Sequence, residues 1–317
     1  MHKKRVYILI LLLILCGTHA LRAQDDMQLS QYWAMPTYYN PGAAGMYDKL
    51  NIRVGTRQQW VGMPGAPKTF LIMGDMPFRF LKANHGVGLL LANDSYGLFK
   101  TMSLGVQYAY KVQLWGGQLS LGLQVGLLSQ TFDGTKVFIP ESDYHQTTDD
   151  AIPTTELQGS GLDIGFGAYY THKYFYVGIS ATHLTNPRIS FDESYEGQIT
   201  GAFYFTAGGN IPLRNPLYEL QPSMMLKTTF QMTQAEVDIR LKYNNFIWGG
   251  LGYRWNEAII FMLGAEYKNF LLGYSYDYST SAIQKASSGS HEVFIGYSMK
   301  LDLSKGKKNK HKSIRIL

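Results

Sequence analysis

The chain has 317 residues, of which 14% are aromatic and 16% charged, and it contains a single cysteine. The formal net charge of +6 misleads, because the basic residues concentrate at the two ends and acidic residues outnumber basic ones in the body between them. Terminal basicity of this kind excludes a nucleic-acid-binding surface spread over a folded domain. A lone cysteine excludes a disulfide framework.

The first residues are typical of a secretory signal peptide. A basic start, Met1-His-Lys-Lys-Arg5, precedes an apolar run from Val6 to Cys16, and Ala23 offers a small residue for cleavage. Such a run is too short for a transmembrane helix. We therefore predict a signal peptide over residues 1–23. Bulky Leu15 before Cys16 argues against a lipoprotein, so the mature chain is expected to lack cysteine.

The segment Leu119–Leu127 alternates strictly between leucine or valine and small or polar residues. Successive side chains of a strand point to opposite faces, so this strand has one apolar side and one polar side. A tilted strand crosses a bilayer in about 9–11 residues. Similar segments recur along the chain. The predicted strands are 50–60, 67–78, 85–93, 99–111, 117–130, 160–171, 174–184, 198–211, 217–229, 235–243, 246–255, 257–267, 269–277 and 290–301.

The lengths of the connections support a membrane barrel. The three longest, Thr131–Gly159, Thr185–Gly197 and Tyr278–Gly289, are the fifth, seventh and thirteenth, all odd-numbered. Even-numbered connections such as Asn244-Asn245 are short. Bacterial outer-membrane barrels have long outer loops and short periplasmic turns. A soluble β-sandwich or β-propeller would carry more charge on its water-facing sides than the Gly, Ser and Tyr found here.

We therefore predict an all-β protein, a transmembrane antiparallel β-barrel of about 14 strands over residues 50–303, in the cell outer membrane and in contact with its lipids. A non-strand segment, 24–49, precedes it and is either periplasmic or lumenal. A basic periplasmic tail, 304–317, follows. The tail could dock on an acidic partner or lipid phosphates, or stay a solubilising end. Its cations are Lys305, Lys307, Lys308, Lys310, Lys312 and Arg315.

Candidate chemistry in the sequence is weak, and we predict no enzyme, cofactor or metal. His183 with Asn186 and Ser180 suggests an outer-membrane hydrolase, but the order and spacing of Ser and His fit poorly. The acidic loop around His145 and Asp149 could hold calcium, although a solvated outer loop is the expectation.

A barrel of this size encloses a lumen that either conducts solutes or is plugged. The segment 24–49 is long enough to enter it, and its aromatic side chains could fill space there. The alternative is a periplasmic strap that leaves a porin open. The aromatic residues in question are Tyr32, Trp33, Tyr38 and Tyr39.

The first third of the mature chain contains an ordered set of motifs: Asn-Pro-Gly-Ala-Ala-Gly, Arg-x-x-Trp and Gly-Ala-Pro, followed by Asn-Asp-Ser-Tyr-Gly. In this order they resemble the PorP/SprF family of the type IX secretion and gliding-motility machinery of Bacteroidota. Gly42 departs from the family, which often has Ala there. The matching residues are Tyr32, Pro36, Asn40, Pro41, Gly45, Arg57, Gln59, Trp60, Gly65, Pro67, Asn93, Asp94 and Gly97.

The resemblance implies a non-enzymatic outer-membrane component. Its partners would be the secretion translocon, the periplasmic ring or peptidoglycan-linked lipoproteins, and a secreted adhesin-type cargo. A plain porin or small-solute channel is the alternative.

The motif residues suit structural roles, and those of the outer rim could also contact cargo. Asn40 and Gly45 are expected to set turns, and Trp60 to anchor beside the first outer loop. Asn93 and Asp94 are expected to cap the second outer loop. Gly65 and Gly97 would permit unusual backbone angles.

Overall fold

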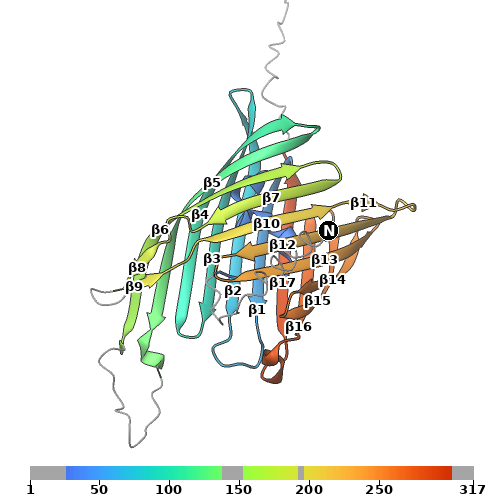
Figure 1. Ribbon diagram of the computed structural model, residues 1–317. Helices are drawn as coiled ribbons and strands as arrows, with labels where there is room; N and C mark the ends of the chain where they lie inside the picture. Colours follow the sequence, from blue (N-terminus) through green and yellow to red (C-terminus); the bar gives the residue numbers. More distant parts are fainter. Residues whose placement is uncertain (1–25, 138–152, 192–195, 302–317) are drawn as a thin grey trace, which may run out of the picture.

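A computed structural model describes residues 26–137, 153–191 and 196–301 and forms a single tilted barrel (Figure 1). Fourteen antiparallel strands pair with their neighbours in the chain, and β10 pairs with β12 to complete the ring. The first barrel strand, β1, pairs with the last, β17, over ten residues from Lys49↔Lys300 to Gln58↔His291. The predicted class and strand number are therefore confirmed.

The strands follow the predicted segments closely, including the two that contain prolines. The largest differences are at the start of β6, which begins four residues earlier than predicted, and at the start of β10, which begins four residues later. The barrel strands are β1 (Lys49–Gln58), β2 (Lys68–Phe80), β3 (Ala83–Tyr96), β4 (Phe99–Leu114), β5 (Gly117–Asp133), β6 (Glu156–Thr171), β7 (Phe175–Thr182), β10 (Ala202–Gly209), β12 (Tyr218–Thr228), β13 (Thr233–Tyr243), β14 (Ile247–Arg254), β15 (Ala258–Tyr267), β16 (Phe270–Ser279) and β17 (Ser290–Lys300).

The alternation of side chains sorts each strand into a lipid face and a lumen face. In β5, Leu123, Val125 and Leu127 are exposed on the outer surface, while Ser120 and Gln124 are buried inside. Apolar groups exposed in this pattern around a closed barrel match the lipid-facing belt of an outer-membrane protein. No helix in the described ranges is long and apolar enough to cross a membrane.

The two ends of the barrel differ. We call the end with the long connections the outer end and the end with the short turns the inner end. The outer connections hold most of the minor elements: η3 (Gly134–Lys136), the hairpin of β8 (Arg188–Ser190) and β9 (Glu196–Gln198), and η4 (Ala282–Lys285). At the inner end, β11 (Ile211–Pro212) pairs briefly with β12.

The residues before β1 form three short helical turns inside the barrel: η1 (Tyr32–Ala34), α2 (Pro36–Tyr39) and η2 (Pro41–Ala43). We call residues 26–46 the plug. Asp26 meets His183 in an outer connection, whereas Gly45 approaches Met76 close to the inner end. The plug therefore descends through the lumen from the outer half to the inner end, where β1 begins.

Candidate functional site: the latched plug

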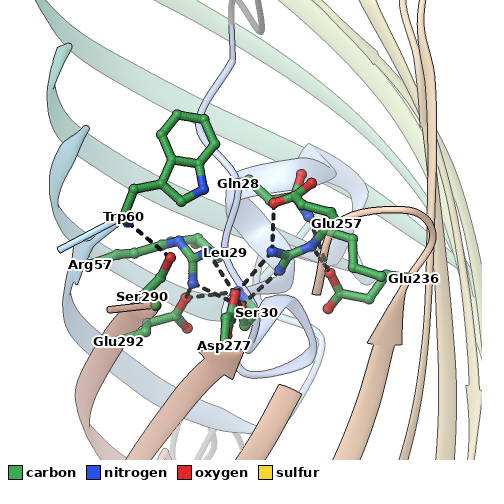
Figure 2. A network of polar contacts seen from close by, with 12 residues as sticks. Gln28, Leu29, Ser30, Arg57, Trp60, Glu236, Glu257, Asp277, Ser290 and Glu292 are labelled. Carbon is green, nitrogen blue, oxygen red and sulfur yellow. Dashed lines mark hydrogen bonds and ion pairs between the residues drawn. The ribbon is translucent and has the colours of Figure 1, made fainter. Parts of the chain in front are cut away.

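Ser30, near the start of the plug, is fixed by carboxylates from two barrel strands (Figure 2). Its backbone N–H donates to Glu292 of β17 at 2.7 Å, and the N–H of Gln31 donates to the other oxygen of that carboxylate at 3.0 Å. The Ser30 hydroxyl donates to Oδ2 of Asp277 in β16 at 2.7 Å. One short stretch of plug is thereby tied to two adjacent strands.

Two arginines on opposite sides of Ser30 complete this contact. Arg57 and Arg254 both donate to the Ser30 hydroxyl oxygen, at 2.8 and 2.7 Å. Arg57 also pairs with Asp277 at 2.7 Å, and Arg254 pairs with Glu236 of β13 at 2.6 Å. We call this network the latch; its members are Ser30, Arg57, Glu236, Arg254, Glu257, Asp277 and Glu292.

The latch is deeply buried, since the arginines and three of the carboxylates expose no more than 1% of their side chains. Removing one member of such a buried ion pair leaves the other charge without a partner, which costs several kcal/mol. The network spans strands β13 to β1 and includes a plug residue. It therefore couples closure of the lumen to the integrity of this wall.

Asp26, the first described residue, makes a second contact at the outer half of the lumen. Tyr38 of the plug donates to its carboxylate at 2.6 Å, and Tyr204 of β10 donates to the other oxygen. Lys227 of β12 donates to its backbone carbonyl at 2.8 Å. Burial alone would raise the pKa of Asp26, but Lys227, His183 and the two tyrosine hydroxyls hold it below the ordinary value.

His183 joins this contact from the outer connection after β7. Its Nδ1 lies 3.0 Å from Asp163, and its Nε2 lies 3.8 Å from Asp26. Burial lowers the pKa of His183, but the hydrogen bond to Asp163 and the charge of Asp26 outweigh burial, so that the pKa is raised above the ordinary value. His183 thus bridges the plug to the wall.

Asn40 fastens the middle of the plug. Its side-chain nitrogen donates to the carbonyl oxygens of Ala168 in β6 and Ile179 in β7, both at 3.0 Å. Its side-chain oxygen accepts from the N–H of Gly42 at 2.8 Å, which starts the η2 turn at Pro41. The turn expected at Asn40 is therefore present, and the same side chain also holds the barrel wall.

Two glycines of the wall let the plug backbone approach closely. A Cβ at Gly122 of β5 would overlap the backbone of Pro41 and Gly42, and a Cβ at Gly86 of β3 would overlap the carbonyl of Ala44. At such contacts a residue other than glycine forces the neighbouring backbone to move. The wall is shaped for the plug at these two positions.

Aromatic packing fills the space between these fixed points. Trp33 meets Trp248 edge to face at 5.0 Å between ring centroids and Phe294 at 6.0 Å. Tyr39 packs on Tyr204 at 5.1 Å. Tyr32 exposes 2% of its surface. Hydrogen bonds, ion pairs and rings together close the lumen.

Motif residues outside the plug gather at the outer rim. The N–H of Gln59 donates to the carbonyl of Pro67 at 3.0 Å and closes the first outer connection. Gly65 and Gly97 adopt the positive φ angles +70° and +55°, and the N–H of Gly97 donates to the carbonyl of Gly65 at 2.8 Å. Two outer connections are thus joined through glycines.

The first outer connection is also bonded to the last one. The N–H of Trp60 donates to the Ser290 hydroxyl at 3.1 Å. Val61 exchanges backbone hydrogen bonds of 2.8 Å with Gly289 and Ser288. These contacts connect the rim across the β1–β17 junction and make it a continuous surface.

Asn93 and Asp94 lie inside β3, which continues to Tyr96, and not in the loop that they were expected to cap. Asp94 instead accepts a hydrogen bond of 2.5 Å from the Thr69 hydroxyl of β2. The side chain therefore links two strands. Pro36 begins α2, as expected for proline in a first helical turn.

The candidate hydrolase residues are not brought together for catalysis. The Ser180 hydroxyl donates to the carbonyl of Tyr39 at 2.6 Å, His183 faces Asp163, and Asn186 accepts from the N–H of Gly201. The signal peptide, the acidic loop around His145 and Asp149, and the basic tail lie outside the described residues.

Of the latch residues, only Arg57 belongs to the motif residues singled out in the sequence. The other charged members lie within predicted strands, and Ser30 lies in the predicted non-strand segment. Charged residues on the lumen face of a barrel strand were the signal that could have indicated a buried network. Their pairing across the lumen depends on strand register, which alternation does not specify.

The fold and the contacts of the plug define the class of this protein: an outer-membrane β-barrel that holds its own N-terminal segment in the lumen. The chain belongs to the family described as type IX secretion system membrane protein PorP/SprF, whose sequence model matches residues 21–297. None of the curated proteins compared with the chain matches it significantly.

Several solved outer-membrane structures are similar to the chain. A mutant of the TodX monoaromatic hydrocarbon channel is 10% identical, with a TM-score of 0.48. The match covers 83% of this chain and 93% of the TodX chain. A Pseudomonas aeruginosa FadL homologue is 9% identical with a TM-score of 0.49 and the same coverage. The Acinetobacter baumannii protein Omp33 is 8% identical with a TM-score of 0.44 and covers 80% of this chain and 99% of its own.

Proposed function

We propose that the protein is a non-enzymatic scaffold of the type IX secretion and gliding machinery that anchors an adhesin-type cargo or assists its export and surface attachment. The plug carries this proposal. A lumen filled by a latched segment suits a barrel that presents a surface, because a channel for solutes needs a free path. The coarser statement, that the chain is an outer-membrane component of this secretion system, follows from its family.

The outer rim supplies the surface for cargo. Hydrogen bonds join the first outer connection to the second through Gly65 and Gly97 and to the last through Trp60 and Ser290. A preorganised surface loses little conformational freedom when a partner binds. The rim is therefore the part of the barrel proposed to hold the cargo.

The inner end faces the periplasm and is proposed to contact the translocon and the periplasmic ring or peptidoglycan-linked lipoproteins. The basic tail, residues 304–317, would reinforce this contact, because its six cations favour an acidic partner. A barrel with a filled lumen suits a protein that is anchored by periplasmic partners at its inner end and presents cargo at its outer rim.

The alternative function is a porin or small-solute channel. Planar-bilayer recordings with the purified protein separate the two. The plugged scaffold predicts no steady conductance for the wild type and intermittent opening when the latch is weakened. Steady large pores in the wild type would refute the scaffold and favour the channel.

The cargo role is tested in cells. Deleting the chain should abolish surface display of one secreted cargo, and a plasmid copy should restore it. Surface labelling of the cargo in intact cells measures the effect. Normal display of every secreted cargo in the deletion strain would rule the proposal out.

A further inference from the structure

Below the plug, at the inner end, the lumen widens into a cavity of about 770 Å³, which we call the vestibule. Trp33 and Pro36 of the plug lie at its floor, and the turn residues Asn245 and Asn269 lie at its mouth. Its wall carries six cationic and three acidic side chains. The cations are Lys49, Arg53, Arg240, Lys242, Lys268 and Lys300; the acids are Asp75, Glu219 and Glu266.

The three acids offset only part of this positive charge. Glu266 pairs with Lys242 at 2.8 Å, Glu219 accepts from Gln221, and Asp75 accepts from the plug N–H of Gly45. Among the residues that the structure describes, the other five vestibule cations form no ion pair with a carboxylate. The vestibule therefore holds an uncompensated positive charge.

Two of these cations are held in place without a direct ion pair. Arg240 is 5% exposed, and its guanidinium carbon lies 3.4 Å from the centre of the Trp33 ring. Gly250 on the neighbouring strand leaves room for its stem, and Gly296 does the same for Arg53. A cation–π contact and two glycine positions thus fix the arginines while their charge stays available.

Two other cations face each other across a strand pair, which destabilises that pair. Lys49 and Lys300 are direct partners in the β1–β17 ladder. Like charges directly opposite each other destabilise a strand pair. Folding alone gives no reason to keep this pair at the mouth of the lumen, whereas an anionic ligand bound between the two lysines would.

The cations lie on β13, in the turn between β15 and β16, on β17 and on β1, and so are spread over an arc of six adjacent strands. Neighbouring strands lie about 4.8 Å apart, so the arc is roughly 24 Å long. An extended peptide covers that distance with about seven residues. A single phosphate or carboxylate would contact only a small part of it.

We propose that the vestibule binds an acidic, extended peptide segment of a periplasmic protein. The inference deepens the proposed function, on which it rests for the periplasmic side of the contact. Residues 302–317 carry six cations against one acid, Asp302, so this end of the chain is itself strongly basic. The ligand's carboxylates would pair with Lys49, Lys300 and Arg53 and reach Arg240 beside Trp33 at the floor of the vestibule.

Fluorescence anisotropy with the full mature chain in nanodiscs tests the proposal. The probe is a labelled octapeptide with four glutamates, and the same peptide with four glutamines is the neutral control. The wild type should bind the acidic probe, bind it more weakly as salt rises, and ignore the neutral one. Equal binding of both peptides, or binding of neither, would overturn the proposal.

Matched double variants locate the site. Lys49→Gln with Lys300→Gln should weaken binding at least tenfold, while Lys68→Gln with Lys100→Gln, which removes the same charge from exposed positions near the outer end, should leave it unchanged. Heat-modifiable migration on gels verifies that each barrel is folded. Wild-type affinity in the inner variant would refute the site.

Two further arms exclude other sources of binding. Removing residues 304–317 should leave most of the affinity in place; complete loss would assign the binding to the tail. Inorganic phosphate should compete only at far higher concentration than the peptide; equal competition would make the vestibule a small-anion site. Cargo display in the deletion strain is read separately, so a failed vestibule leaves the proposed function standing.

Discussion

The latch and the vestibule occupy the same lumen and treat charge in opposite ways. In the latch every charged side chain has an oppositely charged partner within 3.4 Å, and the arginines are completely buried. In the vestibule five cations lack such a partner among the described residues, and the space beside them is open.

This difference separates charges that hold the fold from charges that remain available to a ligand. A buried ion pair is strongly destabilised when one partner is removed. An exposed cation without an ion-pair partner, such as Lys300, adds little to stability and is free to bind. The predictions below test whether the two regions differ in this way.

The largest effect is expected in the latch. Arg254→Met removes the partner of Glu236 and Glu257 and one of the two partners of Asp277, so it should destabilise the protein by about 3–5 kcal/mol. Urea unfolding in micelles, followed by tryptophan fluorescence, measures the loss. Release of the plug should also appear as intermittent conductance in planar bilayers.

The control for this prediction lies in the vestibule. Lys242→Met breaks the pair with Glu266, whose side chains are 18% and 37% exposed. Partly solvated pairs contribute about 0.2–1 kcal/mol. A loss for Arg254→Met no larger than that for Lys242→Met would remove the distinction between the two regions.

The middle of the plug should show an intermediate effect. Asn40→Ala leaves the carbonyls of Ala168 and Ile179 and the N–H of Gly42 without this partner. Unpaired buried polar groups cost about 1–3 kcal/mol. Hydrogen exchange of the η2 amides should accelerate accordingly.

A matched change at a surface amide provides the reference for Asn40. Asn84→Ala removes a side chain at the inner start of β3 whose described contact is a hydrogen bond from Arg79 at 3.1 Å. Its exchange rates should stay at wild-type values throughout the plug. Unchanged η2 exchange in Asn40→Ala would show that the plug is held elsewhere.

The sequence was sufficient for the barrel and insufficient for the latch, for a physical reason. Alternation of side chains is a local property, so the strand Leu119–Leu127 could be identified from its own residues. The contact between Arg57 and Asp277 joins residues 220 positions apart. It depends on how far each strand is shifted around the closed barrel, which no single strand encodes.

The sequence likewise predicted only part of the plug. Aromatic and turn residues between Tyr32 and Gly45 indicated a compact non-strand segment, and positive φ at Gly65 and Gly97 agrees with the angles expected of them. The cap expected at Asp94 was misplaced, because the strand continues past it and Thr69 is within reach. The path of the plug from outer to inner end needed three-dimensional contacts.

The outer contact of the plug should respond to pH. His183 has a raised pKa, so its stabilising contribution is complete below 6.5 and is lost as the pH rises through the raised value. Asp26 has a lowered pKa, so its contribution is complete above 3.8 and is lost as the pH falls through the lowered value. The contact should therefore be tightest between these limits.

Hydrogen exchange at Met27 and Leu29 measures this contact, after correction for the intrinsic pH dependence of exchange. Protection should fall in the wild type as the pH rises from 6.5 through the raised pKa of His183. His183→Gln, which cannot be protonated, should show no such fall, and protection at Asn40 should not follow the titration. A parallel loss in His183→Gln would assign the pH effect to another group.

The smallest effect is expected at the mouth of the vestibule, and its sign is informative. Lys300→Glu turns the like-charged pair with Lys49 into an oppositely charged one, which should stabilise the β1–β17 ladder by about 0.2–1 kcal/mol. Lys300→Gln, which only removes the repulsion, should stabilise it less.

The same Lys300→Glu variant should lose affinity for an acidic peptide. Stability and binding would then change in opposite directions, as expected where charges are kept for a partner. Lower stability in Lys300→Glu would show instead that the two lysines already have partners and that the vestibule resembles the latch.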